Sequence, residues 1–488
     1  MAEGERRERE RKRRRKERER EREREGEREE RAARCGKNRV AMLLLCLFFL
    51  LAREAAGLDN GVGLTPPLAY STWNRFLWTV NQSLIFEIAD SFVSTGLRDA
   101  GYQTINIDAG AWLKERDAAG NLQADPIKFP GGLKPVVAYL KSKGLKLGVY
   151  TDLGVGSCGT GPGSGGHWDQ DAQFFADLGA SYLKVDFCGS PQNYDPDAEL
   201  AAWAAVASAV NKTGHPMYLS ICPKSNAPKN LTGPLTPFKG EGGLYFPPQV
   251  WTKEQKRGVA NAWLVEVRNN VDGWGPSTSP CKDVGAPCGM ITNIDSQVAF
   301  GKWEETGPGG LVDADMLEVC QFNGTVNRPG LTPSEGRLHF YVWALLPSPL
   351  IISFDVRTIQ AQAGGPECLA MVSNPEVLAV NQDSAVIGAR LLRQGGTGGS
   401  PPETSEEVTF QVFGRPLAVA GTWAAVLVNR APVPMNVTLD WGELGLGNPN
   451  WKADVRDLGG RQDLGTFTGS YTALVDARDA VIVSVTLA

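Results

Sequence analysis

The stretch YLKVDFC, residues 182–188, carries a lysine and a carboxylate inside a run that otherwise favours a buried β-strand. Burying a charge costs free energy unless a partner or a function compensates for it. Lys184 and Asp186 are two positions apart and therefore share one face of the strand. From this spacing alone, a structural Asp–Lys pair and a catalytic carboxylate are equally supported.

Seven similar runs occur along the same part of the chain. The eight runs begin near residues 68, 104, 146, 182, 217, 262, 311 and 349, and helical patterns such as GGLKPVVAYLKSKG (131–144) occupy several of the gaps. Strand–helix units repeated at this spacing predict a (β/α)8 TIM barrel, which we place at residues 58–380. From 381 to 488 the pattern becomes alternating and β-rich, which predicts a C-terminal antiparallel β-sandwich.

The first 57 residues differ from the rest of the chain. Residues 1–40 hold 18 Lys/Arg and 12 Asp/Glu, whereas the remainder holds 32 and 43 and is acidic, so no nucleic-acid partner is expected. The apolar run at 41–52 has the length of a signal-peptide core and is too short to span a bilayer. We expect cleavage near residue 57 and no stable membrane association afterwards. Two interpretations stay open for the residues preceding Met42: a long charged leader, or an upstream extension of the gene model with Met42 as the true start.

Features downstream of the apolar run agree with export. Five N-x-[ST] glycosylation sequons follow it, at Asn81, Asn211, Asn230, Asn323 and Asn436. Cys281 and Cys288 flank a Pro/Gly-rich loop and are expected to form a disulfide. For Cys222, Cys320 and Cys368, buried thiols remain an open interpretation. These features predict the secretory pathway, with delivery to the medium, a cell wall or a vacuole-like compartment.

Acidic residues gather where the expected strands end. These residues are Asp108, Asp152, Asp186, Asp313, Asp315, Asp355 and, after the sixth run, Asp272. In a TIM barrel the strand ends form the active-site face. Carboxylates with aromatic neighbours suit a sugar. A cation site is the alternative, but Lys184 beside Asp186 argues against it, so we expect no metal and no cofactor.

Longer segments carry a resemblance to a known family. LDNGVGLTPPLAYSTWNRF (58–76), FPGGLKPVVAYLKSKGLKLGVYTDLGVGSC (129–158) and YLKVDFC (182–188) resemble successive motifs of the α-galactosidase (melibiase) family of retaining glycoside hydrolases. The resemblance extends from about residue 58 to the end. It implies hydrolysis of terminal α-D-galactosides by double displacement.

The resemblance also assigns roles to residues. Asp186 matches the nucleophile, and Asp272, four residues after Arg268, matches the acid/base; Glu266 is a weaker local rival. The implied substrate contacts are Tyr70, Asp108, Tyr150, Lys184, Arg268, Asp315 and Met316. Cys158 and Cys188 match a disulfide pair of the family. A homodimer is a further expectation.

Several positions depart from the family pattern. The family's second aspartate after strand two is Ala109 here, the cysteine that follows is Gly110, and the cysteine partner in the opening segment is also missing. On strand five, Pro223 replaces a family glutamate. These losses leave two alternatives open: the same mechanism on a β-L-arabinopyranoside or an α-N-acetylgalactosaminide, or a non-catalytic sugar-binding protein.

Overall fold

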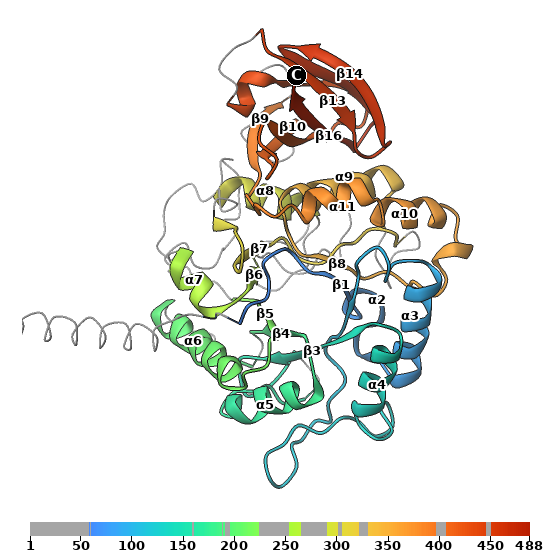
Figure 1. The fold of residues 1–488 in the computed structure, drawn as a ribbon. Coiled ribbons are helices and arrows are strands. Elements are labelled where there is room, and N and C mark those ends of the chain that lie inside the picture. The colour runs from blue at the N-terminus through green and yellow to red at the C-terminus, as the bar shows by residue number, and fades with distance from the viewer. Residues whose placement is uncertain are drawn as a thin grey trace, which may run out of the picture. The chain divides into compact units, whose positions relative to one another are not determined.

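The structure is a computed structural model that describes residues 58, 60–158, 161–187, 189–190, 196–223, 253–264, 290–300, 305–321, 330–396, 407–445 and 450–488. Its first sheet has eight parallel strands in the order β7-β6-β5-β4-β3-β2-β1-β8 (Figure 1). They are β1 (Leu68–Ser71), β2 (Thr104–Ile107), β3 (Lys146–Asp152), β4 (Tyr182–Asp186), β5 (Tyr218–Ile221), β6 (Ala262–Leu264), β7 (Leu311–Asp313) and β8 (Leu350–Ile352). A parallel bridge between Leu317 and Ile352 joins the chain after β7 to β8. The expected (β/α)8 barrel is therefore confirmed.

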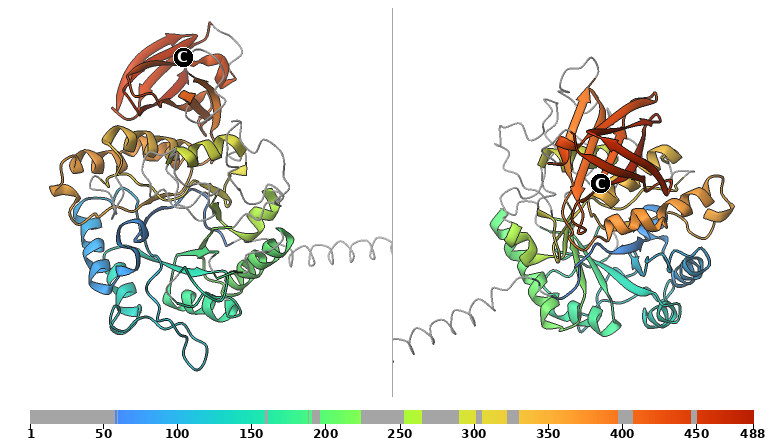
Figure 2. Two further views of the ribbon diagram at one scale, coloured as in Figure 1. Left: turned by 180° about the vertical axis from the view of Figure 1, so that it is seen from behind. Right: turned by 45° about the horizontal axis from the view of Figure 1, so that its top comes forward.

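Helices surround the barrel strands in both orientations drawn (Figure 2). They are α2 (Trp73–Phe76), α3 (Gln82–Ser94), α4 (Lys134–Ser142), α5 (Trp168–Leu178), α6 (Pro196–Lys212), α7 (Lys253–Val259), α8 (Met290–Phe300), α9 (Pro333–Leu345), α10 (Gly365–Val372) and α11 (Pro375–Asn381). On β4, Leu183 and Val185 belong to the core shared with these helices. The alternate residues of β4 point into the barrel, as the two-residue period of a strand requires.

The amino-terminal part of the barrel interior is closed by apolar and aromatic side chains. Tyr182 and Tyr218, which each begin a strand, stack with ring centroids 5.5 Å apart. Ala69, Ala262, Leu311 and Ile351 belong to the same buried cluster. Polar side chains on the inner face therefore lie further along the strands, toward the carboxyl ends where active sites of this fold lie.

The C-terminal region forms two antiparallel sheets. One has the order β14-β13-β16-β11-β10-β9 and the other pairs β12 with β15. The strands are β9 (Arg390–Gly396), β10 (Val408–Pro416), β11 (Thr422–Asn429), β12 (Met435–Asp440), β13 (Lys452–Asp457), β14 (Gln462–Thr468), β15 (Ser470–Val475) and β16 (Asp479–Leu487). This arrangement confirms the predicted β-sandwich.

The larger sheet is buried on both faces at β11, which explains the unbroken apolar run in that strand. Ala425 and Leu427 lie in the core between the two sheets, whereas Ala424 and Val426 join the core that includes α9. Helix α9 is consequently buried along nearly its whole length. A buried ion pair with a 2.7 Å contact also links Arg430, after β11, to Asp295 of α8.

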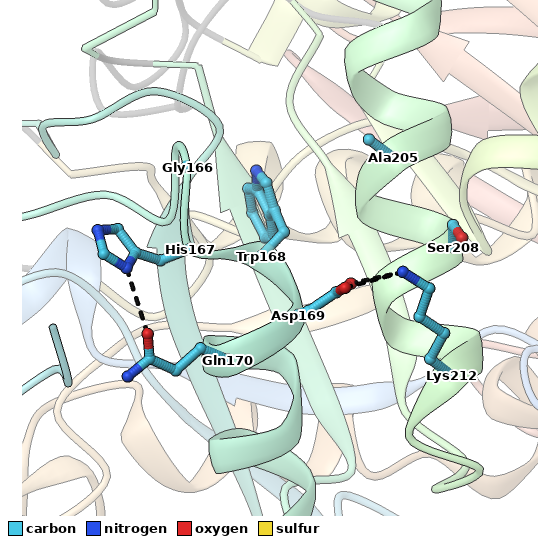
Figure 3. Close-up of a pocket in the computed structure, with 8 residues that line it drawn as sticks. All are labelled: Gly166, His167, Trp168, Asp169, Gln170, Ala205, Ser208 and Lys212. Atoms are coloured by element: carbon cyan, nitrogen blue, oxygen red, sulfur yellow. Dashed lines mark hydrogen bonds and ion pairs between the residues drawn. The ribbon is translucent and has the colours of Figure 1, made fainter. Parts of the chain in front are cut away.

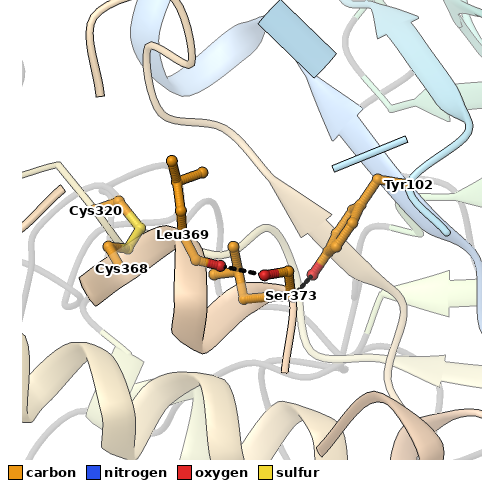
Figure 4. Close-up of a disulfide and its surroundings, with 6 residues drawn as sticks. Tyr102, Cys320, Cys368, Leu369 and Ser373 are labelled. Carbon is orange, nitrogen blue, oxygen red and sulfur yellow. Dashed lines mark hydrogen bonds between the residues drawn. A yellow bond between two sulfur atoms is a disulfide. The ribbon is translucent and has the colours of Figure 1, made fainter. Parts of the chain in front are cut away.

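A disulfide joins two segments that are 48 residues apart. Cys320, in the turn after β7, is bonded to Cys368 of α10, with 5.9 Å between their Cα atoms (Figure 4). Nearby, the Tyr102 hydroxyl donates to the main-chain oxygen of Val372, 2.9 Å away, at the end of the same helix. The interpretation of Cys320 and Cys368 as thiols is therefore wrong, whereas Cys222 takes part in no disulfide.

Only some of the sequence features that predict export lie within the described residues. Asn211 and Asn436 have exposed side chains, whereas Asn81 accepts a hydrogen bond from the Leu84 amide, 3.0 Å away, and caps α3. Asn230, Asn323, Cys281, Cys288 and residues 41–52 lie outside the described residues. Within the described part of the chain, no helix is long and apolar enough to cross a membrane.

Candidate active site

Asp186 is the last residue of β4 and lies half-buried at the carboxyl end of the barrel. Its Oδ1 accepts a hydrogen bond from the main-chain amide of Phe187 at 2.9 Å. Its Oδ2 lies 3.2 Å from the hydroxyl of Tyr150 on the adjacent strand β3. These two donors hold the carboxylate in one orientation while leaving it accessible, which is what a nucleophile needs.

Lys184 lies one pleat before Asp186, and its ion pair is formed with a different residue. The Lys184 ammonium is 3.1 Å from Asp108 Oδ2, and both side chains are buried. Asp108 also accepts hydrogen bonds from the Ser71 hydroxyl, the Asn106 amide and the Ala109 main-chain N–H. Burial alone would lower the pKa of Lys184, but Asp108 and then Asp186 outweigh it and raise that pKa. The cation therefore stays charged beneath the nucleophile.

Asp315 and Met316 follow β7 and line the barrel interior together with Lys184. Asp315 adopts a left-handed φ of 75°, which is uncommon for a residue other than glycine and marks a constrained position. The Met316 amide donates to Asp315 Oδ1 at 2.7 Å, and the Trp343 indole donates to the Asp315 main-chain oxygen at 2.7 Å. Burial raises the Asp315 pKa to about 6, although Lys184 opposes the shift.

Asp152 is a second buried carboxylate beside the nucleophile. The register of β3 and β4 places Asp152 opposite Asp186 and Tyr150 opposite Lys184. Tyr150 Oη is 2.9 Å from Asp152 Oδ2, so one hydroxyl lies between two carboxylates. Burial, followed by the charge of Asp186, raises the Asp152 pKa to about 8. The sequence predicts Asp152 at this strand end but no role for it; the available signal was its i, i+2 spacing from Tyr150.

Acidic groups at this end could also attract a cation. Ligand atoms of Asp152, Cys158 and Asp186 lie within 4.8 Å of one another. Cys158 is disulfide-bonded and so offers no thiolate, and the buried ammonium of Lys184 contributes positive charge to the same interior. The donor set therefore suits a proton better than a metal ion. Cys188, the expected partner of Cys158, lies outside the described residues.

Not every expected site residue joins this group. Tyr70 is fully buried on the outer face of the barrel, where its ring packs edge-on against Phe92 of α3 and its hydroxyl donates to Phe354. It is therefore not positioned to contact a substrate. Asp272, Arg268 and the rival Glu266 lie outside the described residues, and their roles stay predictions.

Two positions that depart from the family motifs, Ala109 and Gly110, lie at one edge of the site, where the structure explains what replaces the missing side chains. A Cβ atom on Gly110 would lie 2.9 Å from the Trp78 Cα, so the close approach of these two segments excludes any side chain at residue 110. The Lys128 ammonium donates to the main-chain oxygens of both Trp78 and Gly110, at 2.8 Å each. Ala109 is buried and offers no side-chain acceptor to a ligand.

A hollow elsewhere on the barrel contains none of the predicted residues. It lies between α5 and α6, and its lining includes His167, Trp168 and the ion pair of Asp169 with Lys212 at 2.8 Å (Figure 3). Both members of that pair are largely exposed. The strand ends, with their convergent buried carboxylates, are the better candidate for chemistry.

Comparison with known proteins agrees with this geometry. The family model described as "Alpha galactosidase A" matches residues 65–230 and 290–383, and that of the "Alpha galactosidase C-terminal beta sandwich domain" matches 407–485. The chain belongs to the α-galactosidase family. It is therefore a glycoside hydrolase.

Individual members of the α-galactosidase family align along most of the chain. Alpha-galactosidase 3 of Arabidopsis thaliana is 34% identical over 86% of this chain and 82% of its own length. A probable α-galactosidase of Dictyostelium discoideum is 32% identical over 89% and 94%. The crystal structure of α-galactosidase I from Mortierella vinacea superposes with a TM-score of 0.72 at 30% identity, covering 88% and 98%.

Proposed function

We propose that the protein removes terminal α-D-galactosyl residues with retention of configuration, with Asp186 as the nucleophile and Asp272 as the acid/base. The observation that carries the proposal is the setting of Asp186, a half-buried carboxylate at the end of β4 with two fixed donors. Kinship with named α-galactosidases supports the choice of sugar.

The described residues suggest how the reaction proceeds. Asp186 attacks the anomeric carbon while Asp272 protonates the departing glycosidic oxygen, so the aglycone leaves as an alcohol and a glycosyl-enzyme forms. Asp272 then takes a proton from a water molecule, which attacks the anomeric carbon and releases the sugar and Asp186. The Lys184–Asp108 pair keeps a positive charge below the nucleophile and presents a carboxylate to the sugar hydroxyls. In the second step Asp186 becomes the leaving group, and the donors from Phe187 and Tyr150 stabilise its returning charge.

One position in the site supports a sugar other than galactose as the glycone of the substrate. Ala109 is apolar and buried next to Asp108, at the place where the family motif has an aspartate. A β-L-arabinopyranoside resembles a galactoside without C6 and needs fewer acceptors there. A site that lacks an acceptor loses its preference for the hydroxyl which that acceptor would bind. We therefore propose β-L-arabinopyranosides as the alternative substrate class.

The test compares three aryl glycosides: p-nitrophenyl α-D-galactopyranoside, β-L-arabinopyranoside and α-N-acetylgalactosaminide. The Asp186→Asn variant should lose at least about 10³-fold in kcat for whichever substrate is turned over. Asp169→Asn, an exposed change in α5 away from the strand ends, is the matched control and should retain full activity. If folded protein hydrolyses none of the three, the proposed activity is wrong and a sugar-binding role takes its place.

We also propose the secretory pathway as the route of the protein. The apolar run at 41–52, the five sequons and the disulfide between Cys320 and Cys368 support this proposal. Digestion of protein from culture medium with an endoglycosidase checks it. A mobility shift that is smaller in the Asn211→Gln/Asn436→Gln variant is the expected result, and protein retained in the cytosol would contradict it.

A further inference from the structure

We propose that Asp152 is a positioning residue that works as a neutral, proton-bearing acid and directs the hydroxyl of Tyr150 toward Asp186. The inference deepens the proposed function, because it takes Asp186 as the nucleophile. It assigns to Asp152 a task in the same site that no motif match supplies.

The geometry places one hydrogen between two acceptors. Tyr150 Oη lies 2.9 Å from Asp152 Oδ2 and 3.2 Å from Asp186 Oδ2. A tyrosine hydroxyl has one hydrogen and therefore donates to one of these oxygens at a time. If both carboxylates were ionised, one would lack this donor and two anions would face each other across neighbouring strands.

A proton on Asp152 resolves the conflict. The Asp152 O–H then donates to Tyr150 Oη, and the Tyr150 O–H donates to Asp186, so each hydrogen has one acceptor. Asp152 has no exposed surface, which favours its neutral form, whereas Asp186 is half-buried and keeps contact with solvent. The order acid–hydroxyl–carboxylate follows from the two distances and the difference in burial.

The charged groups around Asp152 support this assignment. From β4 it faces Asp186 and Lys184, but the Lys184 ammonium is paired with Asp108, which follows β2. From the loop after β3 it receives the Cys158 amide at 3.3 Å. Burial and the neighbouring Asp186 raise the pKa of Asp152 to about 8, while Tyr150, the Cys158 amide and Lys184 oppose that shift.

The arrangement predicts a pH-dependent change beside the nucleophile. Above a pH of about 8, Asp152 releases its proton to water and accepts the hydrogen of Tyr150 in place of Asp186. Asp186 then loses a donor and gains an anionic neighbour. Both changes hinder the step in which Asp186 departs as a carboxylate, because the returning charge is no longer stabilised.

Kinetics of two variants test the proposal. The substrate is 2,4-dinitrophenyl α-D-galactopyranoside, whose leaving group needs no proton, so the titration of Asp272 does not affect its departure. Asp152→Asn supplies an amide N–H to Tyr150 and cannot ionise; Asp152→Ala supplies nothing. We expect Asp152→Asn to stay within about threefold of the wild-type kcat at pH 6 and to show no decline of kcat near pH 8. We expect Asp152→Ala to lose about tenfold or more in kcat.

Two kinetic outcomes would overturn the proposal. One is an alkaline decline in Asp152→Asn that matches the wild type. The other is an equal loss of kcat in the Asn and Ala variants, which would indicate that Asp152 acts as an anion or only as a structural element. In a Tyr150→Phe background, Asp152→Asn should alter the alkaline limb less than it does in the wild type, since the hydroxyl that connects the two carboxylates is gone and only the repulsion between them remains.

An infrared difference spectrum provides a readout that does not require turnover. The protonated-carboxyl stretch at pH 6 should be present in wild type and reduced in Asp152→Asn. In Asp186→Asn the stretch should disappear at lower pH, because the like charge beside Asp152 is gone. If no glycoside is cleaved but the band behaves as expected, the proposed function fails and the proton assignment stands. A band unaffected by Asp152→Asn would refute the assignment.

Discussion

Replacing Lys184 by methionine tests how much the buried ion pair beneath the nucleophile contributes to stability. The Lys184 side chain is 10% exposed and that of Asp108 is 1% exposed, with 3.1 Å between Nζ and Oδ2. Removing one partner of a buried pair costs about 3–5 kcal/mol, because the remaining charge has no counterion. Asp108 would keep donors from Ser71, Asn106 and Ala109, so we expect a loss near about 3 kcal/mol.

Urea unfolding monitored by circular dichroism measures the change in the free energy of unfolding. Lys212→Met is the matched control, since Lys212 pairs with Asp169 where both side chains are more than half exposed, and we expect no measurable change. Asp108→Asn/Lys184→Met removes both charges and should recover much of the lost stability. If Lys184→Met and Lys212→Met were indistinguishable, the argument from burial would be refuted.

Two further predictions concern stability. Burial raises the pKa values of Asp152, Asp313 and Asp315 to about 8, 7 and 6, so the folded state binds more protons than the unfolded chain. The thermal unfolding midpoint should therefore fall as pH rises from about 5 to about 9, and a midpoint that rises over this range would contradict the shifts. The Cys320–Cys368 bond closes a loop of 48 residues, so the Cys320→Ser/Cys368→Ser variant should lose about 4 kcal/mol of unfolding free energy in urea. In the presence of a reductant, the unfolding curves of the wild type and of this variant should coincide.

Much of the barrel could be predicted from the sequence because its strands are short apolar runs at regular spacing. The starts expected at residues 217 and 349 differ by one residue from those of β5 and β8. Which side of a strand faces inward was harder to predict in β1. Its first three residues are apolar, so periodicity does not distinguish the two faces, and Tyr70 lies on the outer one while Ala69 and Ser71 alternate with it.

Contacts between strands account for the remaining differences. The spacing along β4 allowed an ion pair between Lys184 and Asp186, but the ion pair of Lys184 is with Asp108, which follows β2. The closeness of Asp152 to Asp186 depends on the register of β3 and β4, which no local pattern encodes. The partner of Cys320 likewise could not be deduced, since several pairings are compatible with the same cysteine positions.

The contact of Lys128 with the Trp78 and Gly110 carbonyls has a consequence for conditions of use. In the family motifs both segments contribute a cysteine, and here a lysine holds them through hydrogen bonds. Thiol reagents do not break hydrogen bonds, so dithiothreitol leaves these two contacts of Lys128 intact. The edge of the pocket beside Asp108 is thus insensitive to redox potential.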